Sequence, residues 1–208
     1  MKLKNNSKPP REPIKGGTYY GVCVHAIDIG EQKASFKGGY SAKFLWTFEL
    51  FRLENFKMVP VMYEEDGVMK PFDLSITMNN SNHMNSNVAK HLSSWLDDET
   101  VDEDFMEKFD TNDVVGHCAM LKVVLKENGY NDIKTINALP EGFPVPEHGM
   151  ELIRFDMDPW DQEAFDELPD WAKRRIQKSV QYQKQHAKVQ EVSIEKARTA
   201  SKEGGAPF

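Results

Sequence analysis

The sequence has few of the residues and segments that would place it in a membrane or in an oxidising compartment. Its two cysteines, Cys23 and Cys118, are too few for a disulfide scaffold and form no CxxC pair. No apolar run approaches the roughly 18 residues that a membrane-spanning helix needs. The basic N-terminus, residues 1–13, has no apolar stretch behind it, unlike a secretory signal. We therefore expect a protein of the reducing cytoplasm that makes no contact with a membrane.

Sequence signatures of catalysis are absent too. The chain contains no phosphate-binding loop, no GxSxG and no HExxH. A zinc site built from Cys23, His25, His117 and Cys118 would need a distorted strand, because residues 117 and 118 point to opposite faces. The acids of residues 97–113 lie in a connector rich in turn residues, and no catalytic lysine or histidine accompanies them at a set spacing. The sequence therefore predicts no catalytic residue, no metal site and no cofactor.

The charge of the chain is unevenly distributed. The 208 residues carry a formal net charge of −7, which at first sight argues against a nucleic-acid binder. Residues 1–57 nevertheless sum to +5, residues 58–150 to −11 and residues 151–208 to −1. Within the last part, residues 151–170 sum to −7 and residues 171–202 to +7. The local field therefore matters more for binding than the net charge.

Most of the chain has a composition typical of β-strands. Segments rich in aromatic and β-branched residues predict strands at 18–29, 44–53, 56–63, 72–78, 117–126 and 130–139. Residues 30–42, with glycines in the middle, predict a loop, and Asp66-Gly67 and Asn128-Gly129 are typical hairpin turns. Apolar residues at every fourth position from Met84 to Leu96 predict one amphipathic helix of about three turns.

If residues 56–78 are counted as one strand region, the order is three strands, a helix and two more strands. A five-stranded Greek-key barrel of this kind is the OB-fold, and residues 17–139 have the size of such a domain. The sequence therefore predicts a mainly β protein with one inter-strand helix. An α+β sandwich and another small barrel are alternatives.

Outside this domain, composition predicts four further segments. They are a flexible basic arm at 1–16, a linker at 140–150, an acidic segment with a C-terminal helix at 151–199, and a flexible tail at 200–208. The helix should begin near Pro169, because proline is tolerated in a first turn. It should run through the basic stretch 171–202 as a long helical extension.

Two predicted loops combine cations with aromatic rings. In an OB-fold the loop between the first two strands and the loop between the last two flank the ligand groove. Cations neutralise phosphates, and aromatic faces stack on unpaired bases. The residues expected to contact phosphates are Lys33, Lys37, Lys43, Arg52, Lys122, Lys126 and Lys134, and those expected to stack on bases are Phe36, Tyr40, Trp46 and Tyr130. Trp46 also lies on the apolar face of the second strand, between Phe44 and Phe48, which is interpreted as core.

The sequence resembles a family, the OB-fold single-stranded DNA-binding proteins of tailed bacteriophages. The resemblance runs through GTYYGVCVHAIDIG (17–30), Trp46 and Glu49 in the second strand, SSWL (93–96) at the end of the helix, the long segment 109–140, and LPDWAKRRIQKSVQY (168–182). It implies non-catalytic, sequence-tolerant binding of single-stranded DNA during phage replication, recombination or repair. A phage protein of this kind would act in the cytoplasm of its host.

The C-terminus adds a separate resemblance. Many single-stranded DNA-binding proteins end in an acidic tail with a terminal Pro-Phe that recruits replication enzymes, and this chain ends in Pro207 and Phe208. Glu203 is the one acid among the last eight residues, which departs from the dense acid of those tails. Partner recruitment and a plain disordered terminus are therefore both open.

Two other functions compete with DNA binding. The oppositely charged parts of the C-terminal region could pair between subunits, which would make the protein an interaction module that forms an oligomer. The acids of residues 97–113 could alternatively serve a metal-dependent nuclease. The sequence leaves RNA against DNA preference, the size of the occupied site and the oligomeric state undetermined.

Overall fold

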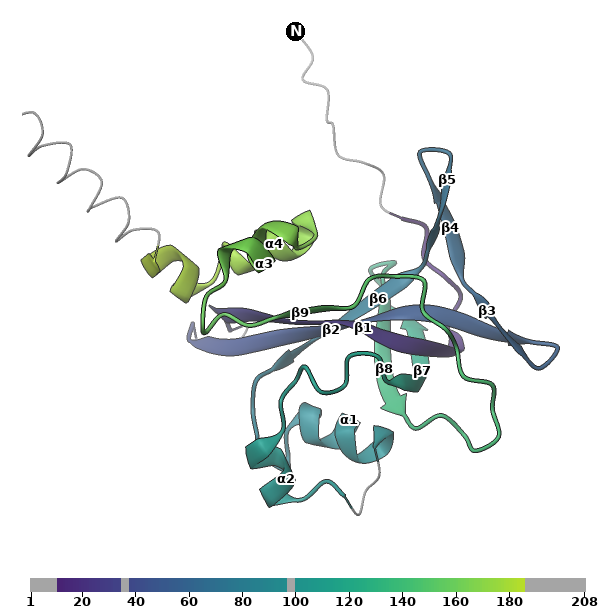
Figure 1. The fold of residues 1–208 in the computed structure, drawn as a ribbon, viewed down its shortest axis with the longest axis horizontal. Coiled ribbons are helices and arrows are strands. Elements are labelled where there is room, and N and C mark those ends of the chain that lie inside the picture. Colours follow the sequence, from purple (N-terminus) through teal and green to yellow (C-terminus); the bar gives the residue numbers. More distant parts are fainter. Residues whose placement is uncertain (1–10, 35–37, 97–99, 186–208) are drawn as a thin grey trace, which may run out of the picture.

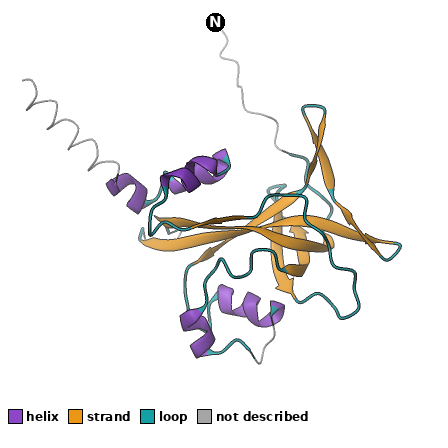
Figure 2. Cartoon of the chain, in the orientation of Figure 1, coloured by secondary structure: helices purple, strands orange, loops and turns teal. Residues whose placement is uncertain are grey.

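A computed structural model describes residues 11–34, 38–96 and 100–185 (Figure 1). The strands are β1 (Gly17–Lys33), β2 (Tyr40–Glu54), β3 (Lys57–Pro60), β4 (Met62–Glu65), β5 (Val68–Pro71), β6 (Asp73–Asn79), β7 (Cys118–Leu125), β8 (Asn131–Asn137) and β9 (Ile153–Phe155). The helices are α1 (Asn87–Trp95), α2 (Glu103–Lys108), α3 (Gln162–Glu167) and α4 (Asp170–Ile176). The prediction of a mainly β protein is confirmed, as Figure 2 shows. No helix in the described ranges is long and apolar enough to cross a membrane.

One antiparallel sheet contains most of the strands. Its order is β3-β2-β1-β7-β8, with β6 also paired to β2 and the short β9 paired in parallel to β1. Strands β6 and β8 lie side by side, but no backbone ladder joins them within the described strands. The sheet is therefore not a closed barrel: it is open between β6 and β8.

The turns between strands follow the sequence prediction in two places. Asp66 and Gly67 have φ of 52° and 80° and connect β4 to β5, as expected for a hairpin turn with two left-handed residues. Gly129, with φ of 81°, lies in the turn between β7 and β8. The expected loop at 30–42 is shorter than predicted, because β1 continues to Lys33 and β2 begins at Tyr40.

Helix α1 closes one end of the core as its periodicity predicted. The Ser86 side chain accepts a hydrogen bond from the Ala89 N–H and so caps the helix. Val88, Leu92 and Trp95 are buried on its inner face. The Trp95 Nε1–H donates to the Cys118 carbonyl at 2.7 Å, which attaches the helix to β7.

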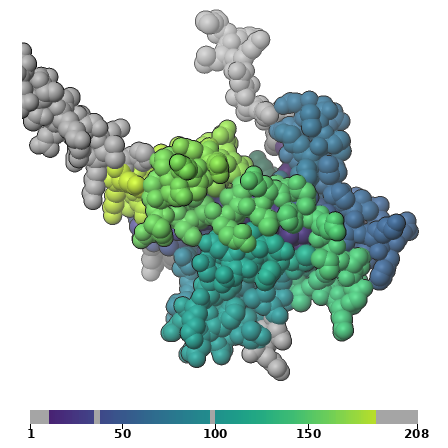
Figure 3. Space-filling view, in the orientation of Figure 1, coloured from purple at the N-terminus to yellow at the C-terminus, as the bar shows by residue number. Residues whose placement is uncertain are grey.

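Strand β2 is buried on both faces, and each face has its own partner. The predicted core face, represented by Phe44 and Phe48, packs with α1 and β7. The opposite face is buried as well: Leu45 packs with residues of α3 and α4, and Thr47 and Glu49 have almost no exposed surface. The C-terminal part of the chain therefore covers the outside of the sheet, and Figure 3 shows the green segment lying over the purple β1.

This covering segment differs from the predicted linker and long helix. Phe143, in the expected linker, packs against Tyr20 and Phe56. Helix α4 begins after Pro169 as predicted but ends at Ile176. A turn at 177–179 follows, and residues 180–185 are helical again. Part of the predicted helix, residues 186–202, and the predicted tail lie outside the described residues.

The buried carboxylate of Glu49 holds the covering segment on the sheet. Glu49 is 1% exposed, and its Oε2 accepts hydrogen bonds from the N–H groups of Gly149 at 2.8 Å and Met150 at 2.9 Å. We expect Glu49→Ala to lower the free energy of unfolding in urea by about 2 kcal/mol, because two charge-assisted bonds are lost. Glu54→Ala, at the exposed end of the same strand, should change it by less than about 0.5 kcal/mol. Equal stability of the two variants would contradict this role of Glu49.

Candidate nucleic-acid interface

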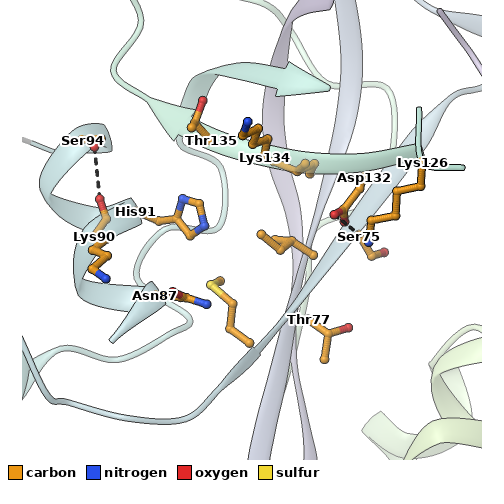
Figure 4. A pocket seen from close by; sticks show the side chains of 13 residues that line it. Ser75, Thr77, Asn87, Lys90, His91, Ser94, Lys126, Asp132, Lys134 and Thr135 are labelled. Atoms are coloured by element: carbon orange, nitrogen blue, oxygen red, sulfur yellow. Dashed lines mark hydrogen bonds and ion pairs between the residues drawn. The ribbon is translucent and has the colours of Figure 1, made fainter. Parts of the chain in front are cut away.

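A polar groove occupies the open edge of the sheet. It has a volume of about 720 Å³ and lies between β6, α1 and β8. Ile76, Met78 and Ile133 contribute its apolar surface. Hydroxyl and amide groups line it as well, from Ser75, Thr77, Asn87, Ser94 and Thr135 (Figure 4).

The groove is positively charged. Among the described residues, Lys90 of α1, Lys126 of the turn after β7 and Lys134 of β8 line it, and Asp132 is the one carboxylate beside them. Lys126 Nζ lies 2.7 Å from Asp132 Oδ2, and both side chains are partly exposed. A surface pair of this kind is weak and readily exchanged. The three lysines and one aspartate give a net charge of +2, although the whole chain is acidic.

A β-bulge aims two side chains of β8 into the groove. Lys122 of β7 pairs with Thr135, and the next residue, Val123, pairs with Ile133. Lys134 is left between them as the extra residue. As a result Lys134 and Thr135 are both exposed and both line the groove, which strict alternation in a strand would prevent.

His91 adds a titratable group next to the lysines. It lies on α1 and lines the groove beside Lys90, as Figure 4 shows. Burial lowers the pKa of His91 below its ordinary value, because the charged ring would lose hydration. At neutral pH the ring is therefore uncharged, and the lysines alone supply the positive charge.

The structure brings the residues predicted around the second loop together. Lys126 and Lys134 line the groove, and Lys122 lies on the neighbouring strand opposite Thr135. Tyr130, in the turn between β7 and β8, is 61% exposed. Its ring is available for stacking.

The residues predicted around the first loop do not line this groove. Lys33 and Tyr40 face each other across the end of the β1–β2 hairpin, and the Tyr40 side chain is exposed. Lys43 is half-buried and pairs with Asn79 of β6, one residue beyond the groove-lining Met78. Phe36 and Lys37 lie outside the described residues, as do Pro207 and Phe208.

Two predicted site residues are placed elsewhere. The interpretation of Trp46 as a base-stacking residue is wrong: the side chain has no exposed surface, and its Nε1–H donates to the Thr111 carbonyl at 2.9 Å. The alternative interpretation of Trp46 as core is confirmed. Arg52 is exposed, but its guanidinium lies 5.8 Å from the ring centre of Tyr19, outside the groove.

The polar face of α1 was missed from the sequence. Lys90 and His91 lie between the buried Ala89 and Leu92, and the sequence interpretation used only the apolar stripe of the helix. An amphipathic helix has a solvent side by definition. The asparagine and serine residues of α1, with Lys90 and His91 between them, could therefore have indicated the groove from the sequence alone.

The described part of the chain offers no metal centre. No group of three or more His, Cys, Asp or Glu side chains in it is arranged to hold a metal ion. Cys23, considered for a zinc site, is fully buried, and burial raises the pKa of its thiol. The acids around α2 are mostly exposed, and Asp102 caps that helix by accepting from the Phe105 N–H at 2.8 Å.

No protein-family model, no curated protein and no solved structure matches this chain. We therefore infer its function from the position, charge and lining of the groove.

Proposed function

We propose that the protein binds single-stranded DNA, without catalysis and with little sequence preference. The observation that carries the proposal is the cationic, hydroxyl-lined groove at the open edge between β6 and β8. Three lysines can neutralise phosphates, and serine, threonine and asparagine side chains can donate hydrogen bonds to phosphate oxygens. The exposed ring of Tyr130 follows the groove residue Lys126 in the same turn. Such rings favour single strands, whose bases are unpaired and free to stack.

The proposal includes an OB-type arrangement for residues 17–139. In an OB-fold the first strand pairs with the second and the fourth, and a helix separates the third strand from the fourth. Here β1 pairs with β2 and β7, β2 pairs with β6, and α1 lies between β6 and β7. This order supports a barrel-like domain left open between β6 and β8. The resemblance to phage proteins supports DNA over RNA and a role in phage replication, recombination or repair.

The first test is the binding of a fluorescent oligo-dT, followed by anisotropy at several salt concentrations. We expect binding at low salt that weakens as salt rises, because phosphate contacts release counterions. Lys90→Ala/Lys134→Ala should weaken binding on the order of tenfold and reduce the slope of log K against log salt by about 1.4, since each contact to a single strand contributes about 0.7.

The matched control is Lys57→Ala/Lys108→Ala. It removes the same charge from exposed positions on β3 and α2 that do not line the groove, so it should bind as wild type does. Absence of binding at low salt by the wild-type protein would refute the proposed function. Equal loss in both double variants would show that net charge, and not the groove, determines binding.

Binding should also depend on pH. Because the pKa of His91 is lowered, the ring is neutral near pH 7 and gains its proton only as the pH falls below the ordinary value of about 6.5. Protonation adds a cation to the groove, so affinity for oligo-dT should rise several-fold between about pH 7.5 and about pH 5.5. His91→Gln should remove this part of the rise. Parallel pH profiles for wild type and variant would exclude His91 from the binding surface.

A further inference from the structure

Helix α4 lies at one end of the groove and contacts its lining. The Arg175 Nη1 of α4 donates to the Thr77 Oγ1 at 2.8 Å, and Thr77 is one of the groove-lining residues of β6. In Figure 4, Thr77 lies on the side of the groove nearest to a pale green helix, in the colour of the C-terminal segment. A ligand that leaves the groove past Thr77 therefore meets α4.

Helix α4 is held at a fixed position on the sheet. Ala172 and Ile176 are fully buried in a cluster with Ile27, Ile29 and Leu45 of β1 and β2. The Gln32 side chain donates through Nε2 to the Arg175 carbonyl at 3.1 Å. The basic side chains of α4 thus have a defined place relative to the groove.

The segment after α4 is fixed as well, through a glycine. Gly30, at the bulge of β1, has a φ of 68°, and a Cβ there would lie 2.9 Å from the Cβ of Ser179. Such a close approach leaves no room for a side chain at position 30. The Glu31 N–H donates to Gln181 Oε1 at 2.7 Å and adds a second attachment.

Helix α4 and the turn after it expose two cations, while the acid Asp170 is exposed at the start of the same helix. Arg174, in the last turn of α4, and Lys178, two residues past the end of the helix, are both exposed. Cations in a last turn stabilise the helix dipole, but that effect does not account for Lys178 beyond the helix. Lys173, by contrast, donates to the Asp166 carbonyl and is engaged within the C-terminal segment.

We propose that α4 extends the binding surface, so that one single strand occupies the groove and then the basic surface formed by Arg174 and Lys178. The strand would run from Lys126 past Thr77 to α4. This inference rests on the proposed function and adds a second phosphate-binding segment to it. It requires a strand long enough to reach both parts, so it predicts a dependence on oligonucleotide length.

The test compares wild type with Arg174→Ala/Lys178→Ala on short and long oligo-dT. Arg175 is left unchanged because it holds Thr77. Both proteins should bind an oligonucleotide of about 6 nucleotides equally, because it fits within the groove. On one of about 16 nucleotides the variant should bind on the order of tenfold more weakly, with a salt slope smaller by about 1.4. Arg174→Gln/Lys178→Gln should bind both oligonucleotides as the alanine variant does. Urea midpoints equal to that of wild type would exclude unfolding of either variant.

The outcomes separate this inference from the proposed function. If wild type binds the long oligonucleotide and both α4 variants match it in affinity and salt slope, α4 is not part of the binding surface. If the variants lose affinity equally at both lengths, the extension beyond the groove is overturned. If binding is unchanged but light scattering shows a different mass, the basic surface contacts a second copy of the chain instead. If wild type binds neither oligonucleotide, the proposed function itself fails.

Discussion

Strand β1 shares its hydrogen bonds among three other strands, and the rest of the architecture depends on this sharing. One of its edges pairs with β2, while the other pairs first with β7, over residues 17–22, and then with β9, over residues 25–27. At the same place, between Cys23 and His25, the register of the β1–β2 pairing shifts. Because a backbone N–H or C=O buried without a partner is costly, the departure of β7 leaves an edge to be filled. The C-terminal segment fills it and brings α3 and α4 onto the outer face.

Between β6 and β8, by contrast, the open edge is not filled by another of the described strands. These strands are neighbours, but within the described strands no ladder joins them, and polar side chains line the space between. Hydroxyls, an amide and lysines are compatible with an edge that remains in water. The same groups are suited to phosphate oxygens, which need donors and positive charge. A break in the sheet thus provides a surface on which a flexible anionic chain can lie.

The uneven distribution of charge allows a cationic groove in an acidic protein. The chain has a net charge of −7, whereas the groove has three lysines for one aspartate. Interactions between exposed charges are screened over roughly 8 to 10 Å in physiological salt. A ligand in the groove therefore responds chiefly to the nearest side chains.

Elements governed by local rules follow from the sequence alone. Three such features agree with the structure: the alternating pattern of β6, the apolar residues at every fourth position of α1, and the Asp-Gly and Asn-Gly turns. Each depends only on residues close together in the chain. Only the tertiary structure decided which apolar faces are covered. Trp46 and Leu45 are adjacent on opposite faces of β2, and both are buried because segments far away in sequence pack on each side. It also decided the groove, since Lys90 of α1 and Lys134 of β8 line the same groove only in the folded chain. Periodicity identifies a polar face, but the position of that face opposite another is set by long-range packing.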